Sequence, residues 1–193
     1  TDPVFAAALG NLAPRLDLRA VSLEAAEDGR FRIVSDLVPI DLGHTELAAA
    51  DRGSYMVVME IADSVETEAG GLGRISFSAG WYVYCGSARK GLAARIARHR
   101  RRTGKRLHWH IDYLARHART SRGLPLASYD NLECELAAAL AHIGGEAVPA
   151  FGSSDCGCES HLFRFDKDPM KDLIFLDVLF RFRHVRALER RGG

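Results

Sequence analysis

The stretch YVYCGSARKGLAARIARH, at residues 82–99, combines side chains that can bind and act on a phosphate group. Tyr84 precedes a Cys-Gly-Ser turn, and the segment after that turn carries Arg95 and His99 but no acidic residue. A guanidinium can place two parallel hydrogen bonds on phosphate oxygens, while tyrosine and histidine can position or relay a proton. Taken alone, the same pattern also fits a strand aromatic followed by a solvated helix face.

Basic residues are concentrated in one part of a chain whose formal net charge is only +1. Ten lysines and arginines, and no acidic residue, lie between Glu68 and Asp112. A block of one sign predicts a face that binds a polyanion such as nucleic acid, although Arg and Lys are also favoured at solvated helix C-termini. The residues that we expect to contact nucleic acid are Arg89, Lys90, Arg98, Arg101, Arg102, Lys105, Arg106, His108 and His110.

A second group of residues has the spacing of metal ligands. Cys156, Cys158 and His161 form a C-x-C-x-x-H pattern in a turn rich in Gly and Ser, and Cys134 could supply a fourth ligand from the preceding helix. Three thiolates and one imidazole hold structural Zn²⁺ in a closed tetrahedral site. The alternative is a tight turn with small buried cysteines. The four cysteines form no obvious disulfide framework.

The segment HWHID, at residues 108–112, is a further candidate. His108 and Asp112 are four residues apart, so on a helix Asp112 could orient the imidazole of His108. A metal site here would need a third ligand that the sequence does not supply. We therefore expect a structural or substrate-contacting face.

The composition fits one domain of ordinary size with additional segments. The chain has 193 residues, of which 47% are hydrophobic, which is enough for a sizeable core. No apolar stretch approaches the roughly 20 residues of a membrane helix, and no basic-then-apolar leader is present. We therefore expect a cytoplasmic protein without a membrane partner, and the sequence does not indicate an oligomeric state. The first residue is Thr rather than Met, which is typical of a fragment or a processed chain.

Hydrophobic periodicity predicts both strands and helices along the chain. A short helix and a β-hairpin are expected in residues 1–43, followed by a connector at residues 44–52 and the main domain at residues 53–190. Within the main domain we expect strands at residues 54–61, 75–78 and 80–86, and helices at residues 91–104, 107–118, 130–145 and 168–185.

Several motifs in the main domain carry a family resemblance. They are, in order, Gly53-Ser54-Tyr55, Tyr84-Cys85-Gly86, the helix motif Leu92-x-x-Arg95-x-x-x-His99, Glu133 in an E-x-x-L context, and the segments LHWHIDYL (107–114) and FGSSDCGCESHLF (151–163). From Gly53 to about Arg183 the chain resembles the GIY-YIG endonuclease superfamily, and within it the DUF123 (Uri-like) branch. The resemblance implies a GIY-YIG-like α+β fold, in which a small, mainly antiparallel sheet is flanked by helices.

The resemblance implies a metal-dependent nuclease, a hydrolase that cleaves nucleic-acid phosphodiesters, with DNA favoured over RNA. Glu133 would hold Mg²⁺ or Mn²⁺, and Arg95 would bind a non-bridging phosphate oxygen. Tyr55 would take a proton from water if a cation and the arginine lower its pKa. Tyr84 and His99 would position the reacting groups or relay a proton. Two alternatives stay open: a DNA- or RNA-binding module with a decayed site, and a zinc-stabilised interaction module.

The chain departs from the family pattern in two ways. Ser54 and Cys85 replace the two usual isoleucines, which are buried strand positions rather than chemical ones. Tyr84 follows Tyr55 by 29 positions, a longer spacing than the common motif has. An inserted hairpin through GGLGR, at residues 70–74, accounts for the difference, and it would lie near the active face.

The first 43 residues carry a second resemblance. The segment DPVFAAALGNLAPRL and the hairpin after it are similar to the C-terminal end of the sugar fermentation stimulation protein family. The match covers only the final helix and hairpin of that family. The acidic and lysine residues of that family's core precede the part that matches, and they are absent from this sequence. We therefore expect residues 1–43 to contain no catalytic residue.

Overall fold

The computed structural model describes residues 21–25, 31–35 and 51–185. These residues fall into two units, residues 1–42 and 43–193. In the first unit, β1 (Val21–Ala25) and β2 (Phe31–Ser35) form an antiparallel hairpin, which confirms the predicted strand pair. The helix predicted before this hairpin, residues 16–20 of its first strand and most of the connector lie outside the described residues.

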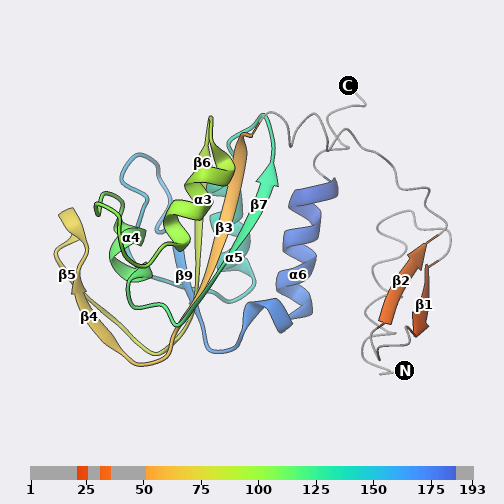
Figure 1. Ribbon diagram of the computed structural model, residues 1–193, viewed down its shortest axis with the longest axis horizontal. Helices are drawn as coiled ribbons and strands as arrows, with labels where there is room; N and C mark the ends of the chain where they lie inside the picture. Colours follow the sequence, from red (N-terminus) through yellow and green to blue (C-terminus); the bar gives the residue numbers. More distant parts are fainter. Residues whose placement is uncertain (1–20, 26–30, 36–50, 186–193) are drawn as a thin grey trace. The chain divides into compact units, whose positions relative to one another are not determined.

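The second unit is built on a five-stranded antiparallel sheet with the strand order β7-β3-β6-β9-β8 (Figure 1). The interior strand β3 pairs with β6 on one side and with β7 on the other. This arrangement confirms the expected α+β class. The strands are β3 (Gly53–Ile61), β6 (Gly80–Ala88), β7 (Thr120–Ala127), β8 (Glu146–Ala147) and β9 (Leu162–Phe165).

Helices cover both faces of this sheet, which explains why β3 is almost continuously apolar. Tyr55 and Val57 pack into one core with side chains of α3 and α4, while Met56 and Val58 pack into a second core with side chains of α5 and α6. Because successive strand residues point to opposite faces, every position of the strand except Glu60 is buried. The helices are α3 (Leu92–Arg100), α4 (His110–Ala115), α5 (Glu133–His142) and α6 (Leu173–Phe180).

The predicted insertion between β3 and β6 is a hairpin. It consists of β4 (Val65–Glu68), the 3₁₀ turn η2 (Gly70–Leu72) and β5 (Arg74–Phe77). The turn lies against α4: a Cβ atom added at Gly70 would be 3.6 Å from the ring of His110. The insertion therefore packs on the helix that carries the HWHID segment.

Two helices differ from the sequence-based expectation. The helix expected at residues 107–118 begins only at His110. The helix expected at residues 168–185 is divided into the 3₁₀ turn η3 (Pro169–Lys171), α6 and a short π-helical segment η4 (Arg181–Val185). The division follows from two caps, because the carboxylates of Asp168 and Asp172 accept hydrogen bonds from the backbone N–H groups of Met170 and Ile174.

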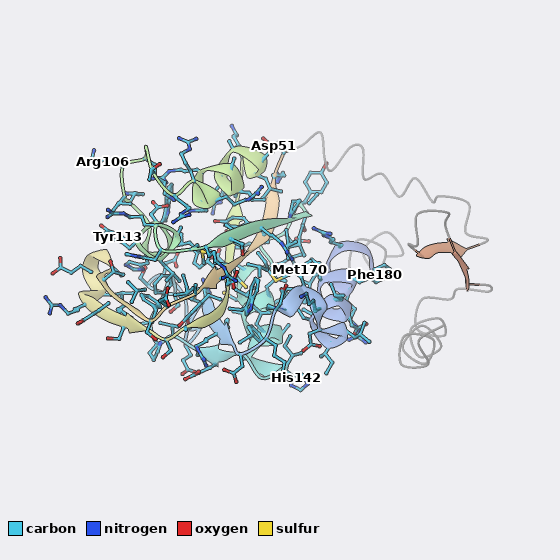
Figure 2. The ribbon with its side chains drawn as sticks, turned by 60° about the horizontal axis from the view of Figure 1, so that its bottom comes forward. Asp51, Arg106, Tyr113, His142, Met170 and Phe180 are labelled. Atoms are coloured by element: carbon cyan, nitrogen blue, oxygen red, sulfur yellow. The ribbon has the colours of Figure 1, made fainter. Side chains whose placement is uncertain are left out.

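Figure 2 shows Arg106, in the loop before α4, far from Phe180 at the end of α6. No described helix has the length and apolar character needed to cross a membrane.

Candidate functional site

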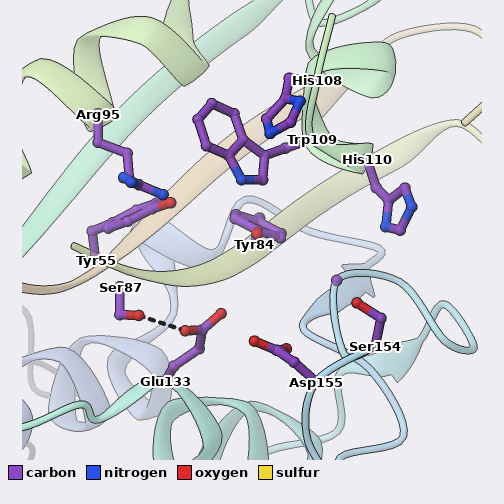
Figure 3. Close-up of a pocket in the computed structure, with 11 residues that line it drawn as sticks. Tyr55, Tyr84, Ser87, Arg95, His108, Trp109, His110, Glu133, Ser154 and Asp155 are labelled. Atoms are coloured by element: carbon purple, nitrogen blue, oxygen red, sulfur yellow. Dashed lines mark hydrogen bonds between the residues drawn. The ribbon is translucent and has the colours of Figure 1, made fainter. Parts of the chain in front are cut away.

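A pocket of about 430 Å³ lies where β3 begins and β6 ends. Four of the five predicted catalytic residues line it and come from four different elements: Tyr55 from β3, Tyr84 from β6, Arg95 from α3 and Glu133 from α5 (Figure 3). The other lining residues are Ser87, His108, Trp109, His110, Gly152, Ser154 and Asp155. The fold thus brings together predicted catalytic residues that are up to 78 positions apart, from Tyr55 to Glu133, and Asp155 lies further still along the chain.

Gly86 explains how the Tyr55 ring reaches the pocket. The two residues are partners across β3 and β6, and a Cβ atom at Gly86 would lie 2.4 Å from the Tyr55 hydroxyl oxygen. Only glycine leaves space for the ring to lie across the neighbouring strand. Tyr84 lies next to Tyr55, with 6.3 Å between the ring centroids.

Both tyrosines hold their protons more firmly than a tyrosine in water. Burial raises the pKa of Tyr55 well above its ordinary value, although Arg95 acts in the opposite direction. Burial also raises the pKa of Tyr84. The prediction that Arg95 helps to lower the pKa of Tyr55 is therefore correct in sign, but burial outweighs the arginine.

Arg95 lies against Trp109, a wall of the pocket that the sequence analysis did not single out. The guanidinium carbon of Arg95 is 4.9 Å from the centroid of the Trp109 ring, and that of Arg98 is 4.5 Å from the same centroid. Such cation–π contacts limit the positions that a long side chain can adopt. The indole therefore helps to hold Arg95 beside the Tyr55 hydroxyl (Figure 3).

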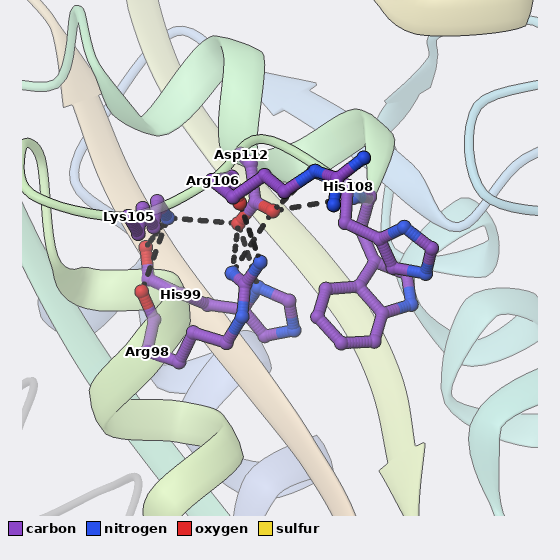
Figure 4. A network of polar contacts seen from close by, with 7 residues as sticks. Arg98, His99, Lys105, Arg106, His108 and Asp112 are labelled. Atoms are coloured by element: carbon purple, nitrogen blue, oxygen red, sulfur yellow. Dashed lines mark hydrogen bonds and ion pairs between the residues drawn. The ribbon is translucent and has the colours of Figure 1, made fainter.

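Asp112 is fully buried and is the centre of a polar network (Figure 4). Its carboxylate oxygens lie 3.0 Å from Arg98 Nη1 and 2.8 Å from Lys105 Nζ, and they accept hydrogen bonds from the backbone N–H groups of His108 and Trp109. Burial alone would raise the pKa of Asp112, but its hydrogen bonds hold that pKa far below the ordinary value. Asp112 therefore remains ionised and fixes the start of α4.

This network corrects two expectations from the sequence. Asp112 contacts the backbone of His108, and the imidazole beside it is that of His99, whose Nδ1 is 3.4 Å from Asp112 Oδ1. The pairing of Asp112 with the His108 imidazole is wrong because α4 begins after His108. Arg98 and Lys105 were expected to be free cations for nucleic acid, yet Asp112 balances their charge, and the Lys105 side chain is only 3% exposed.

His99, the fifth predicted catalytic residue, lies behind the tyrosines rather than at the pocket surface. It is 1% exposed, and its ring stacks on Tyr55 with a centroid distance of 5.7 Å. Burial lowers its pKa below the ordinary histidine value even though Asp112 acts to raise it. His99 is thus a neutral ring at neutral pH that supports Tyr55.

The remaining predicted nucleic-acid contacts are distributed over the surface and the pocket. His108 and His110 line the pocket. Of the other predicted contacts, the following are exposed: Arg89, Lys90, Arg101, Arg102 and Arg106.

Glu133 is the first residue of α5, and its carboxylate is held at both oxygens. The hydroxyl of Ser87 donates a hydrogen bond of 2.7 Å to Oε2, and Nδ1 of His161 lies 3.0 Å from Oε1. The start of the helix is fixed by the buried residue Ser54, because its hydroxyl accepts a hydrogen bond of 2.9 Å from the Leu132 N–H. Figure 3 shows the carboxylate of Asp155 directed toward the same part of the pocket.

Cys134, Cys156, Cys158 and His161 form a group that could hold a metal ion, as predicted from their spacing. Their donor atoms all lie within 4.8 Å of one another. Nε2 of His161 is 3.4 Å from Cys156 Sγ and 4.0 Å from Cys134 Sγ. Hydrogen bonding to Cys158 and burial raise the pKa of Cys134 to about 12, so the thiols interact closely.

Five residues that line the pocket were not predicted as site residues: Ser87, Trp109, Gly152, Ser154 and Asp155. Ser87 directly follows the Tyr-Cys-Gly motif, Trp109 lies within the HWHID segment, and Asp155 precedes Cys156. Their positions beside recognised motifs were the available signal.

The family described as domain of unknown function DUF123 matches residues 54–180, which is most of the chain and includes every element of the pocket. No curated protein and no solved structure matches the chain. The chain therefore belongs to the DUF123 family.

Proposed function

We propose that this protein hydrolyses phosphodiester bonds in nucleic acid, DNA in preference to RNA, with the help of Mg²⁺ or Mn²⁺. The observation that carries the proposal is the meeting of Arg95, the two tyrosines and Glu133 in one pocket. The order of these residues along the chain also resembles that of the GIY-YIG endonuclease superfamily. These are the residue types that phosphoryl chemistry needs: a cation for the phosphate, hydrogen-bonding groups and a carboxylate.

Arg95 is the group that would bind the phosphate. Its guanidinium is placed beside Tyr55 and against Trp109, and it would donate hydrogen bonds to a non-bridging oxygen as charge develops there. Tyr55 keeps its proton at neutral pH because of its raised pKa, so its hydroxyl would donate a hydrogen bond to the phosphate or orient a water molecule. Tyr84 and the neutral His99 would hold Tyr55 in place.

Glu133 is the residue that would hold the divalent cation. A carboxylate oxygen has two lone pairs, so the contacts with Ser87 and His161 leave capacity on both oxygens of Glu133. Asp155 adds a second carboxylate to the same pocket, and oxygen donors suit Mg²⁺ and Mn²⁺. When bound, such an ion supplies Lewis acidity toward the phosphate and lowers the pKa of a bound water molecule.

Exposed cations would bind the nucleic-acid backbone around this pocket. Arg89 and Lys90 precede α3, while Arg101, Arg102 and Arg106 follow it, and all five are exposed. Contacts of this kind supply affinity without sequence preference.

A second candidate is a nucleic-acid-binding module that no longer cleaves. Two observations favour it: burial keeps Tyr55 protonated, and Glu133 already has two partners within the protein.

A third candidate is an interaction module stabilised by Zn²⁺ at the Cys₃His group. We propose Zn²⁺ for this group because three sulfurs and one nitrogen are donors that Zn²⁺ prefers. We also propose a cytoplasmic location, because thiols stay reduced there.

Cleavage and binding measured in parallel distinguish these candidates. Labelled single-stranded, duplex and branched DNA, and RNA, would be incubated with Mg²⁺ or Mn²⁺ and the wild type, Arg95→Ala or Glu133→Ala. Arg116→Ala and Glu68→Gln change exposed residues outside the pocket and serve as matched controls. Cleavage lost in both pocket variants while binding survives supports the nuclease. Binding without cleavage on every substrate supports the second candidate, and neither activity supports the third.

A further inference from the structure

His161 lies between the Cys₃His group and the pocket. The residue is 1% exposed, and its two ring nitrogens face different partners. Nε2 lies 3.4 Å from Cys156 Sγ, inside the metal-ligating group, while Nδ1 lies 3.0 Å from the Glu133 carboxylate. One imidazole thus connects a set of metal ligands to a carboxylate of the pocket.

The donor set fits a zinc-type ion closely. The sulfur atoms around a tetrahedral Zn²⁺ ion are about 3.8 Å apart, given bonds of about 2.3 Å. The four donor atoms here already lie within 4.8 Å of one another, so small side-chain shifts would close the site. The cysteines come from α5 and from the loop that precedes β9, which means that an ion would join the start of α5 to that loop.

An ion at Nε2 would fix which ring nitrogen of His161 carries the proton. The contact of His161 with Glu133 does not have the geometry of a well-formed hydrogen bond, so Nδ1 is a buried polar atom without a hydrogen-bond partner among the described residues. A neutral imidazole whose Nε2 binds a metal must carry its proton on Nδ1. In this protein that N–H would face Glu133 Oε1.

We propose that a metal ion held by Cys134, Cys156, Cys158 and His161 positions the Glu133 carboxylate in the pocket through the His161 imidazole. His161 would anchor Oε1 while Ser87 anchors Oε2. Because Cys134 directly follows Glu133 on α5, the same ion would also fix the backbone next to that carboxylate. His161 is thus a positioning residue, and the metal site is part of the pocket's architecture as well as of the fold.

The first test reads the histidine directly and does not depend on cleavage. The wild type loaded with one equivalent of Zn²⁺ under reducing conditions would be studied by long-range ¹H–¹⁵N NMR, and the His161 signals would be assigned by their loss in His161→Cys. We expect a metal-bound Nε2 and a protonated Nδ1. In Glu133→Gln the Nδ1–H proton signal should move upfield with zinc content unchanged, whereas Glu68→Gln should leave it in place. An unprotonated Nδ1, a signal unaffected by Glu133→Gln, or no zinc binding would overturn the proposal.

The second test rests on the proposed function and separates positioning from folding. His161→Cys retains four zinc ligands as a Cys₄ set but removes the imidazole that contacts Glu133. We expect one zinc ion per chain and an unfolding midpoint close to that of the wild type, with cleavage reduced about 10- to 100-fold. His142→Ala, a change of an exposed histidine on α5, should cleave like the wild type. Full cleavage by zinc-loaded His161→Cys would overturn the proposal. If the wild type cleaves no substrate, the proposed function is contradicted but the positioning of Glu133 by His161 is not. The NMR experiment then tests that positioning by itself.

Discussion

Asp112 and Glu133 are two carboxylates that each contact a buried histidine, yet the protein uses them differently. Asp112 is fully buried, and its oxygens are surrounded by Arg98, Lys105, His99 and two backbone N–H groups. Glu133 lines the pocket and has close contacts with only Ser87 and His161. The difference indicates that Asp112 is committed to structure, while Glu133 retains capacity for a ligand.

Removing the buried carboxylate should have the largest effect. Asp112→Ala leaves Lys105 buried without a counter-charge and removes the cap of α4. We expect a loss of about 3–5 kcal/mol in the free energy of unfolding, because an unpaired charge in the interior is costly. Urea denaturation followed by circular dichroism measures this loss. A variant as stable as the wild type would show that the network does not stabilise the fold.

The corresponding change at the pocket should affect activity rather than stability. Glu133→Gln keeps the shape of the side chain and an acceptor for the Ser87 hydroxyl but removes the negative charge. We expect cleavage to fall about 100-fold or more, with unfolding free energy changed by less than about 1 kcal/mol. Single-turnover cleavage and urea denaturation on the same preparation test both parts. A large loss of stability would mean that Glu133 is structural, as Asp112 is.

Acid should reveal the contribution of Asp112 to stability. The hydrogen bonds of Asp112 depress its pKa in the folded state, so its stabilising contribution is present above its unfolded pKa of about 3.9 and is lost as pH falls toward the folded value. Below about pH 4 the unfolding free energy of the wild type should therefore fall more steeply than that of Asp112→Asn. Parallel pH dependence in the two proteins would contradict the assigned role of Asp112.

The smallest effect should come from an exposed cation. Arg101 lies at the end of α3 and is exposed, whereas Arg98, on the same helix, is paired with Asp112. Arg101→Ala should lower affinity for all DNA sequences about equally and reduce the slope of log K against log salt by about 1. Fluorescence anisotropy at several salt concentrations measures the slope. An unchanged slope would place the bound nucleic acid away from the end of α3.

Local patterns were sufficient for several elements and for the metal-ligating group. The apolar run in β3, the glycine-rich hairpin at residues 70–74 and the C-x-C-x-x-H spacing each predicted what the structure contains. Even the contribution of Cys134 could be predicted, because its helix directly precedes the cysteine-rich loop. The resemblance of residues 1–43 to the sugar fermentation stimulation protein family stays a prediction.

Pairings across long sequence separations could not be predicted in the same way. Ser87 and Glu133 are 46 positions apart, and Ser54 and Leu132 are 78 apart, so only the completed sheet brings each pair together. The block of cations was also misjudged, because folding places Asp112 against Arg98 and Lys105. Charge counted along a sequence does not show which charges are neutralised in three dimensions.

The most direct test of the central claim is the Mg²⁺ dependence of DNA cleavage by the wild type and by Arg95→Ala. The proposed function predicts that wild-type cleavage of at least one labelled DNA rises with Mg²⁺ concentration. It also predicts that Arg95→Ala cleaves about 100-fold more slowly while binding the same DNA with similar affinity. A wild type that binds DNA but never cleaves it, or an Arg95→Ala variant that cleaves as fast as the wild type, would contradict the claim.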